Sequence, residues 1–470
     1  MKKIRIDFLQ DYIPIIEEEK MWSYILFFTV VFTYKVSMFL ISIPFIVFMI
    51  KMKKENKRKF PYIFGYYSIV RILFSMVVEN RSIQAQGLRM LFLVWILTII
   101  FSGKNIKSLI LDLKEILIKE KIIKYIFVIV FWGTLWNFLS PGGKASGFGY
   151  FNNIQIWLLC FLAMPYMKEK RKIEKLLWLV MVFSTLLNFY EILNLYANRN
   201  FHQVLSNGRV NSITVGISIF SYFFLKILLP NKLGIKMISI IGCLMWIVMI
   251  LLSGGRGSAL AILFSVIFSI ILICKKKALI YIPILISLCM LLLHSDLDLA
   301  KRFRHLSNMD MKNNTSYARI ALVKAGIYTF KKNVVFGSGF GNTQEYFIQY
   351  RDIKLSDVTE KGLLYGMNQR ELENFPDSHN IIIDYLASTG LFGVVLSIFF
   401  IFFIPTISLK DFIRRNFQEG LYCFMVFMTF NVGGMTWSTL MQHTKGTSFL
   451  VIMLLLLVYK RGEKSEFIES

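Results

Sequence analysis

The chain has 470 residues, of which 56% are hydrophobic, with a mean hydropathy of +0.57 and a formal net charge of +25. The apolar residues gather in long runs repeated along most of the chain, which excludes an ordinary soluble multidomain protein and indicates a polytopic helical membrane protein. Most basic residues lie in short clusters between these runs, so they indicate membrane topology rather than a nucleic-acid-binding patch.

Apolar runs and their flanking charges predict about thirteen spans, within a range of about 12 to 14. We expect an all-α integral membrane protein with a single membrane domain over residues 1–470. Residues 22–50 exceed one bilayer thickness and contain Lys35, so they form either one tilted helix or a hairpin of two short ones. Residues 1–20 are too polar for a cleavable signal peptide, so the first span should direct insertion. The expected spans lie near residues 22–50, 61–79, 88–102, 125–139, 150–166, 176–196, 213–229, 237–253, 258–274, 278–293, 381–408, 421–437 and 446–459.

Lysine-rich and lysine-poor loops alternate between these spans. By the positive-inside rule the lysine-rich loops should face the cytoplasm. They are residues 51–60, 104–124, 168–175, 231–236, 275–277, 410–415 and 460–464. The outer side should then hold residues 140–149, 198–212, 253–258 and 294–380.

The loop at 294–380 is a largely polar stretch, whereas every other outer loop is short. Loops much longer than a dozen residues are usually functional or disordered. Apolar residues at helical spacing predict a helix over 315–332, and the glycine turn at 337–347 should lead into a second short helix. We expect an ordered, partly helical cap, with residues 352–374 as its loosest part.

Three arginines are expected on the outer side: Arg209 in SNGRVNS, Arg256 in SGGRGS, and Arg319 in the helix over 315–332. The turn that carries Arg256 is so short that its guanidinium must lie near the membrane boundary. Phosphate or pyrophosphate matches the planar fork of a guanidinium best, through paired charge-assisted hydrogen bonds. Taken singly, each arginine can also be a solvated topology marker.

His379 stands where the polar loop ends and the next apolar run begins. Histidine is suited to general-base chemistry because its ordinary pKa, about 6.5, lies near neutrality. Asn380 could cap the helix that follows, and Asp384 could orient the histidine or line a polar cavity. Gly390 and Gly393 would allow a helix break or close packing.

In this chain HNIIIDYLASTGLFG at 379–393 matches the pattern His-[Asn/Ser/Gln]-x9-Gly-x-x-Gly at every fixed position. With NGRVNSITVGISIF at 207–220, SGGRGSALAILF at 253–264 and ARIALVKAGIYTFKKNVVFGSGFGN at 318–342, it resembles the bacterial O-antigen ligase and polysaccharide polymerase superfamily. Arg319 matches the arginine of the family's Arg-x-x-x-Leu pattern, although the last position here is Val323. The resemblance covers about the C-terminal 60% of the chain and implies a GT-C-like helical architecture.

The resemblance implies metal-independent, inverting glycosyl transfer from a saccharide on undecaprenyl pyrophosphate. His379 would be the general base, and Arg256 and Arg319 would stabilise the pyrophosphate. Arg209, Asn380 and Asp384 would contact the substrate. No metal site or cofactor is expected, since the sequence shows neither a DxD-type site on a nucleotide-binding fold nor a phosphate-binding loop.

The resemblance leaves polymerase and ligase open, because both share these motifs. A polymerase is favoured, since the Lys/Ile-rich composition fits an AT-rich genome, in which such polymerases are often this divergent. A transporter for the same lipid-linked unit is the rival from another class, although it would often show two related halves. The expected location is the bacterial cytoplasmic membrane, with the site facing outward. Expected partners are membrane lipids, a flippase and a chain-length regulator, and no nucleic acid.

Overall fold

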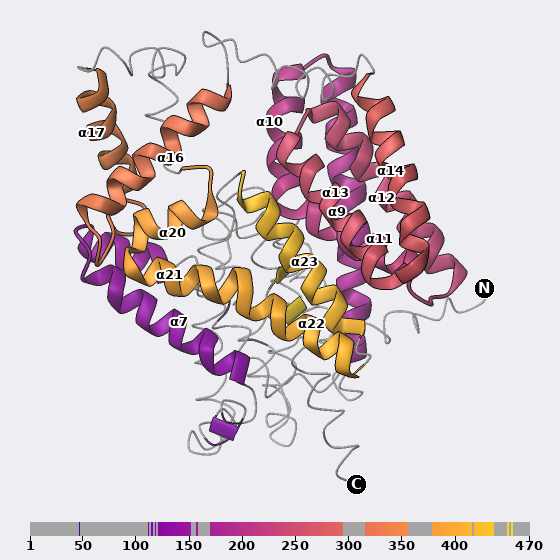
Figure 1. The fold of residues 1–470 in the computed structure, drawn as a ribbon, viewed down its shortest axis with the longest axis horizontal. Helices are drawn as coiled ribbons and strands as arrows, with labels where there is room; N and C mark the ends of the chain where they lie inside the picture. Colours follow the sequence, from indigo (N-terminus) through magenta and orange to yellow (C-terminus); the bar gives the residue numbers. More distant parts are fainter. Residues whose placement is uncertain are drawn as a thin grey trace. The chain divides into compact units, whose positions relative to one another are not determined.

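A computed structural model describes residues 121–151, 170–294, 315–355, 378–415 and 418–436, together with a few isolated positions (Figure 1). The chain divides into two compact units. The first comprises Met1–Val130, Asn152–Ser184 and Thr447–Ser470, and the second comprises Phe131–Phe151 and Thr185–Gly446. All predicted site residues lie in the second unit.

The described residues contain helices and turns but no strand, which confirms the expected all-α class. Five stretches among them are long and apolar enough to span a membrane, so the chain is a polytopic membrane protein. These stretches are Ile173–Ala197, Gln203–Leu228, Leu233–Ser253, Arg256–Leu291 and Leu391–Arg415. The expected spans near 22–50, 61–79 and 88–102 lie outside the described residues, and those near 150–166 and 446–459 lie largely outside them.

The first unit is described chiefly at the start of α7 (Lys121–Phe138) and in the first half of α9 (Lys170–Ala197). Ile122, Leu176 and Leu177 are buried there. Both helices continue into the second unit. They correspond to the spans predicted near 125–139 and 176–196.

The centre of the second unit is a bundle in which α11 (Ile217–Leu228) contacts α12 (Leu233–Ser253), α13 (Arg256–Cys274) and α23 (Gln418–Gly434). Hydroxyl groups join three of these helices: Ser221 Oγ lies 2.8 Å from both Ser265 Oγ and Thr429 Oγ1. Small and hydroxylated residues are typical of helix interfaces in membranes, because they allow close approach and hydrogen bonding between helices.

A turn of three lysines separates α13 from α14 (Ala278–Leu293). The 36 residues of Arg256–Leu291 therefore form two helices that contact each other, as the predicted spans 258–274 and 278–293 require. Lys275 at this turn has φ +48°.

Three predicted boundaries were wrong. Residues 198–212 were expected to be an outer loop, but α10 (Phe201–Asn211) begins there and continues through a π-helix, Ser212–Gly216, into α11. In the predicted loop 140–149, the residues from Gly143 onward are helical. In both segments polar residues or glycines suggested a loop. Such residues lower helix propensity only weakly, so a helix still forms there when one of its faces packs against the protein.

The third boundary concerns the span expected at 381–408. This segment breaks into α20 (Ile381–Thr389) and α21 (Leu391–Ser397), followed by a π-helix, Ile398–Phe403, and α22 (Ile404–Arg415). The membrane-spanning stretch starts only at Leu391. Gly390 at the break has φ +60°, a conformation that favours glycine.

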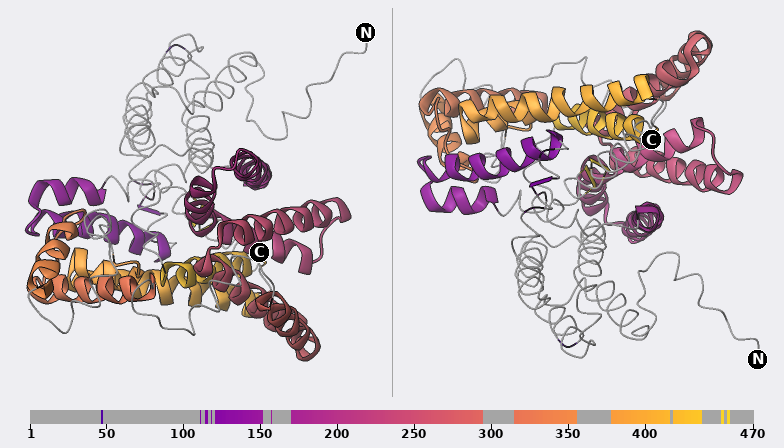
Figure 2. Two further views of the ribbon diagram at one scale, coloured as in Figure 1. Left: turned by 90° about the horizontal axis from the view of Figure 1, so that it is seen from above. Right: turned by 90° about the horizontal axis from the view of Figure 1, so that it is seen from below.

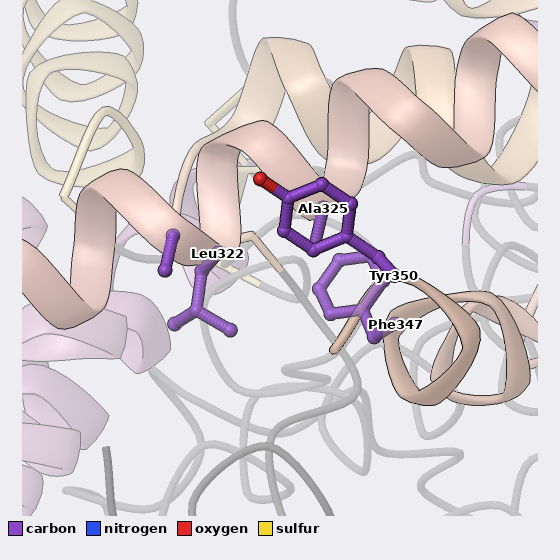
Figure 3. Close-up of a cluster of buried hydrophobic side chains, with 5 residues drawn as sticks. Leu322, Ala325, Phe347 and Tyr350 are labelled. Carbon is purple, nitrogen blue, oxygen red and sulfur yellow. The ribbon is translucent and has the colours of Figure 1, made fainter. Parts of the chain in front are cut away.

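The long loop predicted to lie on the outer side holds the two helices expected of it, α16 (Thr315–Lys332) and α17 (Thr343–Leu355). They pack through a buried cluster of Ala321, Leu322, Ala325, Phe347 and Tyr350 (Figure 3). Most of the segment predicted to be loosest, 352–374, lies outside the described residues.

The glycine-rich turn after α16 binds the end of α20. Ser338 N–H and Gly339 N–H donate to the carbonyls of Ala387 and Ser388, both at 2.9 Å. Trp136 of α7 donates its indole N–H to the carbonyl of Thr389 at 3.0 Å. The last carbonyls of a helix have no partner within it, so these donors satisfy groups that the break at Gly390 exposes. As a result α20 packs against α16, and Trp136 of α7 binds its C-terminal end; Figure 2 gives two further views of the described helices.

Candidate functional site

His379 immediately precedes α20, and its side chain is buried, with 8% of its surface exposed. Its backbone has φ +55°, in the left-handed region that residues with a Cβ rarely adopt. Asn380 follows as the N-cap of α20, as predicted. Its Oδ1 accepts hydrogen bonds from the backbone N–H groups of Ile382 and Ile383 at 3.1 and 3.2 Å.

Asp384 faces back toward the start of the helix. Its Oδ1 accepts hydrogen bonds from the backbone N–H of Ser378 at 2.6 Å and from the Ser378 hydroxyl at 2.7 Å. One carboxylate oxygen of Asp384 therefore binds the residue directly before His379. Sequence reasoning did not select Ser378, although a serine and an aspartate on either side of a histidine were a visible signal.

Helix α16 packs against this segment at Gly326. A methyl group at that position would collide with Ile383 Cγ2 and approach Ser378 Cβ to 3.1 Å. Arg319 lies seven residues earlier in α16, almost two full turns, and so on the same face as Gly326. The face of α16 that touches the neighbours of His379 therefore also carries Arg319.

Arg319 and Arg256 lie within electrostatic range of each other, although 63 positions separate them in the sequence. The pKa of Arg319 is lowered, first by burial of its guanidinium and then by the positive charge of Arg256. Two like charges in a partly buried site repel, and an anion between them would relieve this repulsion. A bound phosphate group would supply such an anion.

Arg256 is the first residue of α13 and follows Gly254, whose φ of +61° ends α12 in the left-handed conformation. Gly257, the next residue, packs so closely on Thr436 that a methyl group there would collide with the Thr436 hydroxyl. Thr436 lies just beyond the end of α23. The start of α13 is therefore fixed against the end of α23.

The end of α23 also meets the start of α20. A methyl group on Gly434 would lie 3.2 to 3.3 Å from three atoms of Ile381, two residues after His379. One end of α23 thus contacts both the residue after Arg256 and a residue close to His379. Sequence reasoning missed this role of Gly434, because close contacts between distant helices leave no local pattern.

Arg209 lies on the last turn of α10, and not in a loop. Its Nε donates a hydrogen bond to the carbonyl of Ser253 at 2.9 Å, three residues before Arg256. Ser212 Oγ and Ser258 Oγ lie 3.1 Å apart and join the same two segments. Arg209 therefore stabilises the turn that precedes Arg256 by a hydrogen bond to its backbone.

The structure thus brings the beginnings of α13 and α20 to one end of α23, with α16 against α20. His379 and Arg256 thus stand next to helix starts that contact the same end of α23, and Arg319 lies within electrostatic range of Arg256. Within the described part of the chain, no group of three or more His, Cys, Asp or Glu side chains is positioned to hold a metal ion.

These features define a polytopic helical membrane protein in which a candidate histidine and a candidate arginine lie beside helix starts that contact the same end of α23. Residues 241–398 match a family model described as O-antigen ligase, which confirms the resemblance to the O-antigen ligase and polysaccharide polymerase superfamily. The match covers about a third of the chain and includes Arg256, Arg319 and His379, but not Arg209. The family indicates an enzyme that transfers glycosyl groups. No match to a curated protein was found.

Proposed function

We propose that this protein polymerises oligosaccharide repeat units, carried on undecaprenyl pyrophosphate, into a surface polysaccharide such as O-antigen or capsule. The reaction would take place on the outer leaflet of the bacterial cytoplasmic membrane by metal-independent, inverting glycosyl transfer. The main support is that the start of α13, which carries Arg256, and the start of α20, which follows His379, both contact the end of α23.

In this reaction His379 removes the proton from an acceptor hydroxyl. The hydroxyl oxygen then attacks the anomeric carbon of the donor sugar from the face opposite the pyrophosphate. The bond from the anomeric carbon to the pyrophosphate oxygen breaks, and the configuration at that carbon inverts. A base positioned in this way typically contributes about 100- to 10,000-fold to the rate.

Arg256 and Arg319 stabilise the charge that develops on the departing pyrophosphate. Groups fixed in advance toward a developing charge often make the largest contribution to catalysis. The lowered pKa of Arg319 supports this role, because it reflects first the burial of the guanidinium and then the positive charge of Arg256, and a bound anion would offset both. Arg209 is an auxiliary contact, and Asn380 contributes its amide group, since its Oδ1 is engaged in capping α20.

A ligase that transfers the glycan to a lipid or protein acceptor is the second candidate, and the description of the matching family favours it. The two differ only in the acceptor. A polymerase attaches the growing chain to a sugar on a second lipid carrier, whereas a ligase requires a different acceptor. Expected partners are membrane lipids and, in the same pathway, a flippase and a chain-length regulator.

The test uses purified full-length protein and a defined undecaprenyl-pyrophosphate-linked oligosaccharide. A polymerase produces a ladder of longer glycans from this substrate alone, and the ladder persists in chelator. A product formed only when a core lipid or protein is added identifies a ligase instead. Movement of the lipid-linked unit across a vesicle membrane without any new glycosidic bond would identify a transporter and refute both proposals.

A further inference from the structure

Hydrogen bonds join Ser378, the residue before His379, to Asn380 and Asp384, which follow it. Ser378 places both its N–H and its hydroxyl on Asp384 Oδ1, at 2.6 and 2.7 Å. The same hydroxyl lies 3.2 Å from the carbonyl oxygen of Asn380. Ser378 is fully buried, so these bonds are shielded from competition by water. Hydrogen bonds to a carboxylate are among the stronger ones in proteins.

This closed loop coincides with an unusual backbone conformation. In the described part of the chain, Arg199, Lys275 and His379 are the residues other than glycine with positive φ. Arg199 and Lys275 are exposed, whereas His379 is buried. Such a conformation persists only where the surrounding structure enforces it, and it is concentrated at functional sites.

The second constraint comes from α16. Gly326 allows this helix to lie directly on Ser378 and Ile383, where any larger side chain would collide. Ser378 is therefore held from one side by Asp384 and from the other by α16. Movement of Ser378 would shift the backbone of His379, the next residue.

We propose that Ser378 and Asp384 are positioning residues, which hold the His379 backbone in the left-handed conformation and so direct the imidazole toward the acceptor hydroxyl. Asp384 thus acts on His379 through Ser378, which gives a route for the orienting role considered from the sequence and differs from the substrate contact that the resemblance implies. This inference rests on the proposed function, because the direction of the imidazole matters only if His379 is the base.

The kinetic test compares purified Ser378→Ala with wild-type protein. Loss of the hydroxyl should lower kcat by up to about 100-fold, the effect of displacing a reacting group by about 1 Å. The KM for the lipid-linked oligosaccharide and the midpoint of the pH profile should not change, because the substrate contacts and the imidazole remain. Asp384→Asn should retain more activity than Asp384→Ala, because the amide keeps an oxygen that accepts hydrogen bonds.

Ser388→Ala is the matched control. The Ser388 hydroxyl lies on the same helix and also binds Asp384, but it donates to the backbone carbonyl, at 2.5 Å. Its removal leaves the carboxylate and Ser378 in place. This variant should therefore keep wild-type kcat.

A second measurement does not depend on turnover. Diethyl pyrocarbonate modification of each histidine is followed by mass spectrometry in folded protein, with exposed His294 as the internal reference. Modification of His379 should be several-fold faster in Ser378→Ala and Asp384→Ala than in wild-type or Ser388→Ala protein.

Wild-type turnover, or unchanged His379 modification, in folded Ser378→Ala and Asp384→Ala would overturn the positioning role even if His379→Ala is inactive. Full activity of His379→Ala would instead refute the proposed function.

Discussion

At the scale of single residues, the backbone of His379 allows its chemical role to be separated from its structural one. Asparagine tolerates the left-handed conformation better than other residues with a Cβ, whereas alanine does not. His379→Asn should therefore unfold at the wild-type temperature, and His379→Ala should lose about 1 kcal/mol of stability. Both should lose about 100-fold or more of the activity, because neither can accept the proton.

Thermal unfolding and gel analysis of the glycans check this prediction. In cells, lipid-linked single units should accumulate in both variants. A full polymer ladder from either variant would show that His379 is not the base.

The two guanidinium groups give a second prediction at this scale. Arg256→Lys and Arg319→Lys should each lower kcat by about tenfold or more, since lysine lacks the planar fork that matches pyrophosphate. Lysine also loses its proton more readily when buried near another cation. The activity of Arg319→Lys relative to wild-type protein should therefore decrease as the pH rises.

Arg414→Lys is the control for these variants, because Arg414 is exposed in the last turn of α22, in a basic segment predicted to face the cytoplasm. It should have wild-type activity at every pH. Wild-type rates in both site variants would reduce Arg256 and Arg319 to markers of topology.

At the scale of elements, the break between α20 and α21 determines where His379 and its helix lie. Gly390 has positive φ, and a methyl group there would collide with the carbonyls of Val334 and Val335 in the turn that follows α16. Gly390→Ala should therefore destabilise the protein by about 2 kcal/mol or more and reduce activity.

Gly341→Ala measures the destabilisation caused by the positive φ alone, without a steric collision. Gly341 also has positive φ, but a methyl group there would meet nothing within 4 Å. It should cost only about 1 kcal/mol, and activity should be retained. Equal unfolding temperatures for the two variants would contradict the role assigned to the contact between α16 and Gly390.

The helices and the break between them also show which structural features the sequence predicted and which it did not. The helix predicted over 315–332 has those bounds in the structure, because its apolar spacing is a local property. The break at Gly390 was foreseen only as a possibility, since its position depends on carbonyls in the turn after α16. The helix α10 was missed because its polar residues resemble a loop when taken alone.

At the scale of the whole molecule, the alternation of charge predicts which ends of the helices face the cytoplasm. In a cysteine-free protein, Asn198→Cys should react with a membrane-impermeant thiol reagent added to intact cells with a permeable outer envelope. Lys276→Cys should react only after the inner membrane is opened. Both positions are exposed, so access depends on the side of the membrane. The reverse pattern would place the site on the wrong side for an outer-leaflet reaction.

The sequence alone determined the class of protein, the alternation of its loops, the helices of the outer loop and the residues suited to the chemistry. These follow from hydropathy, charge and local spacing, which act over a few residues. The contacts of Gly257 and Ile381, the neighbours of Arg256 and His379, with the end of α23 appear only in the folded chain, as does the binding of Ser378 to Asp384. These contacts depend on glycines at 257, 326 and 434, where helices distant in sequence approach closely, and no local pattern specifies which helix will fill that space.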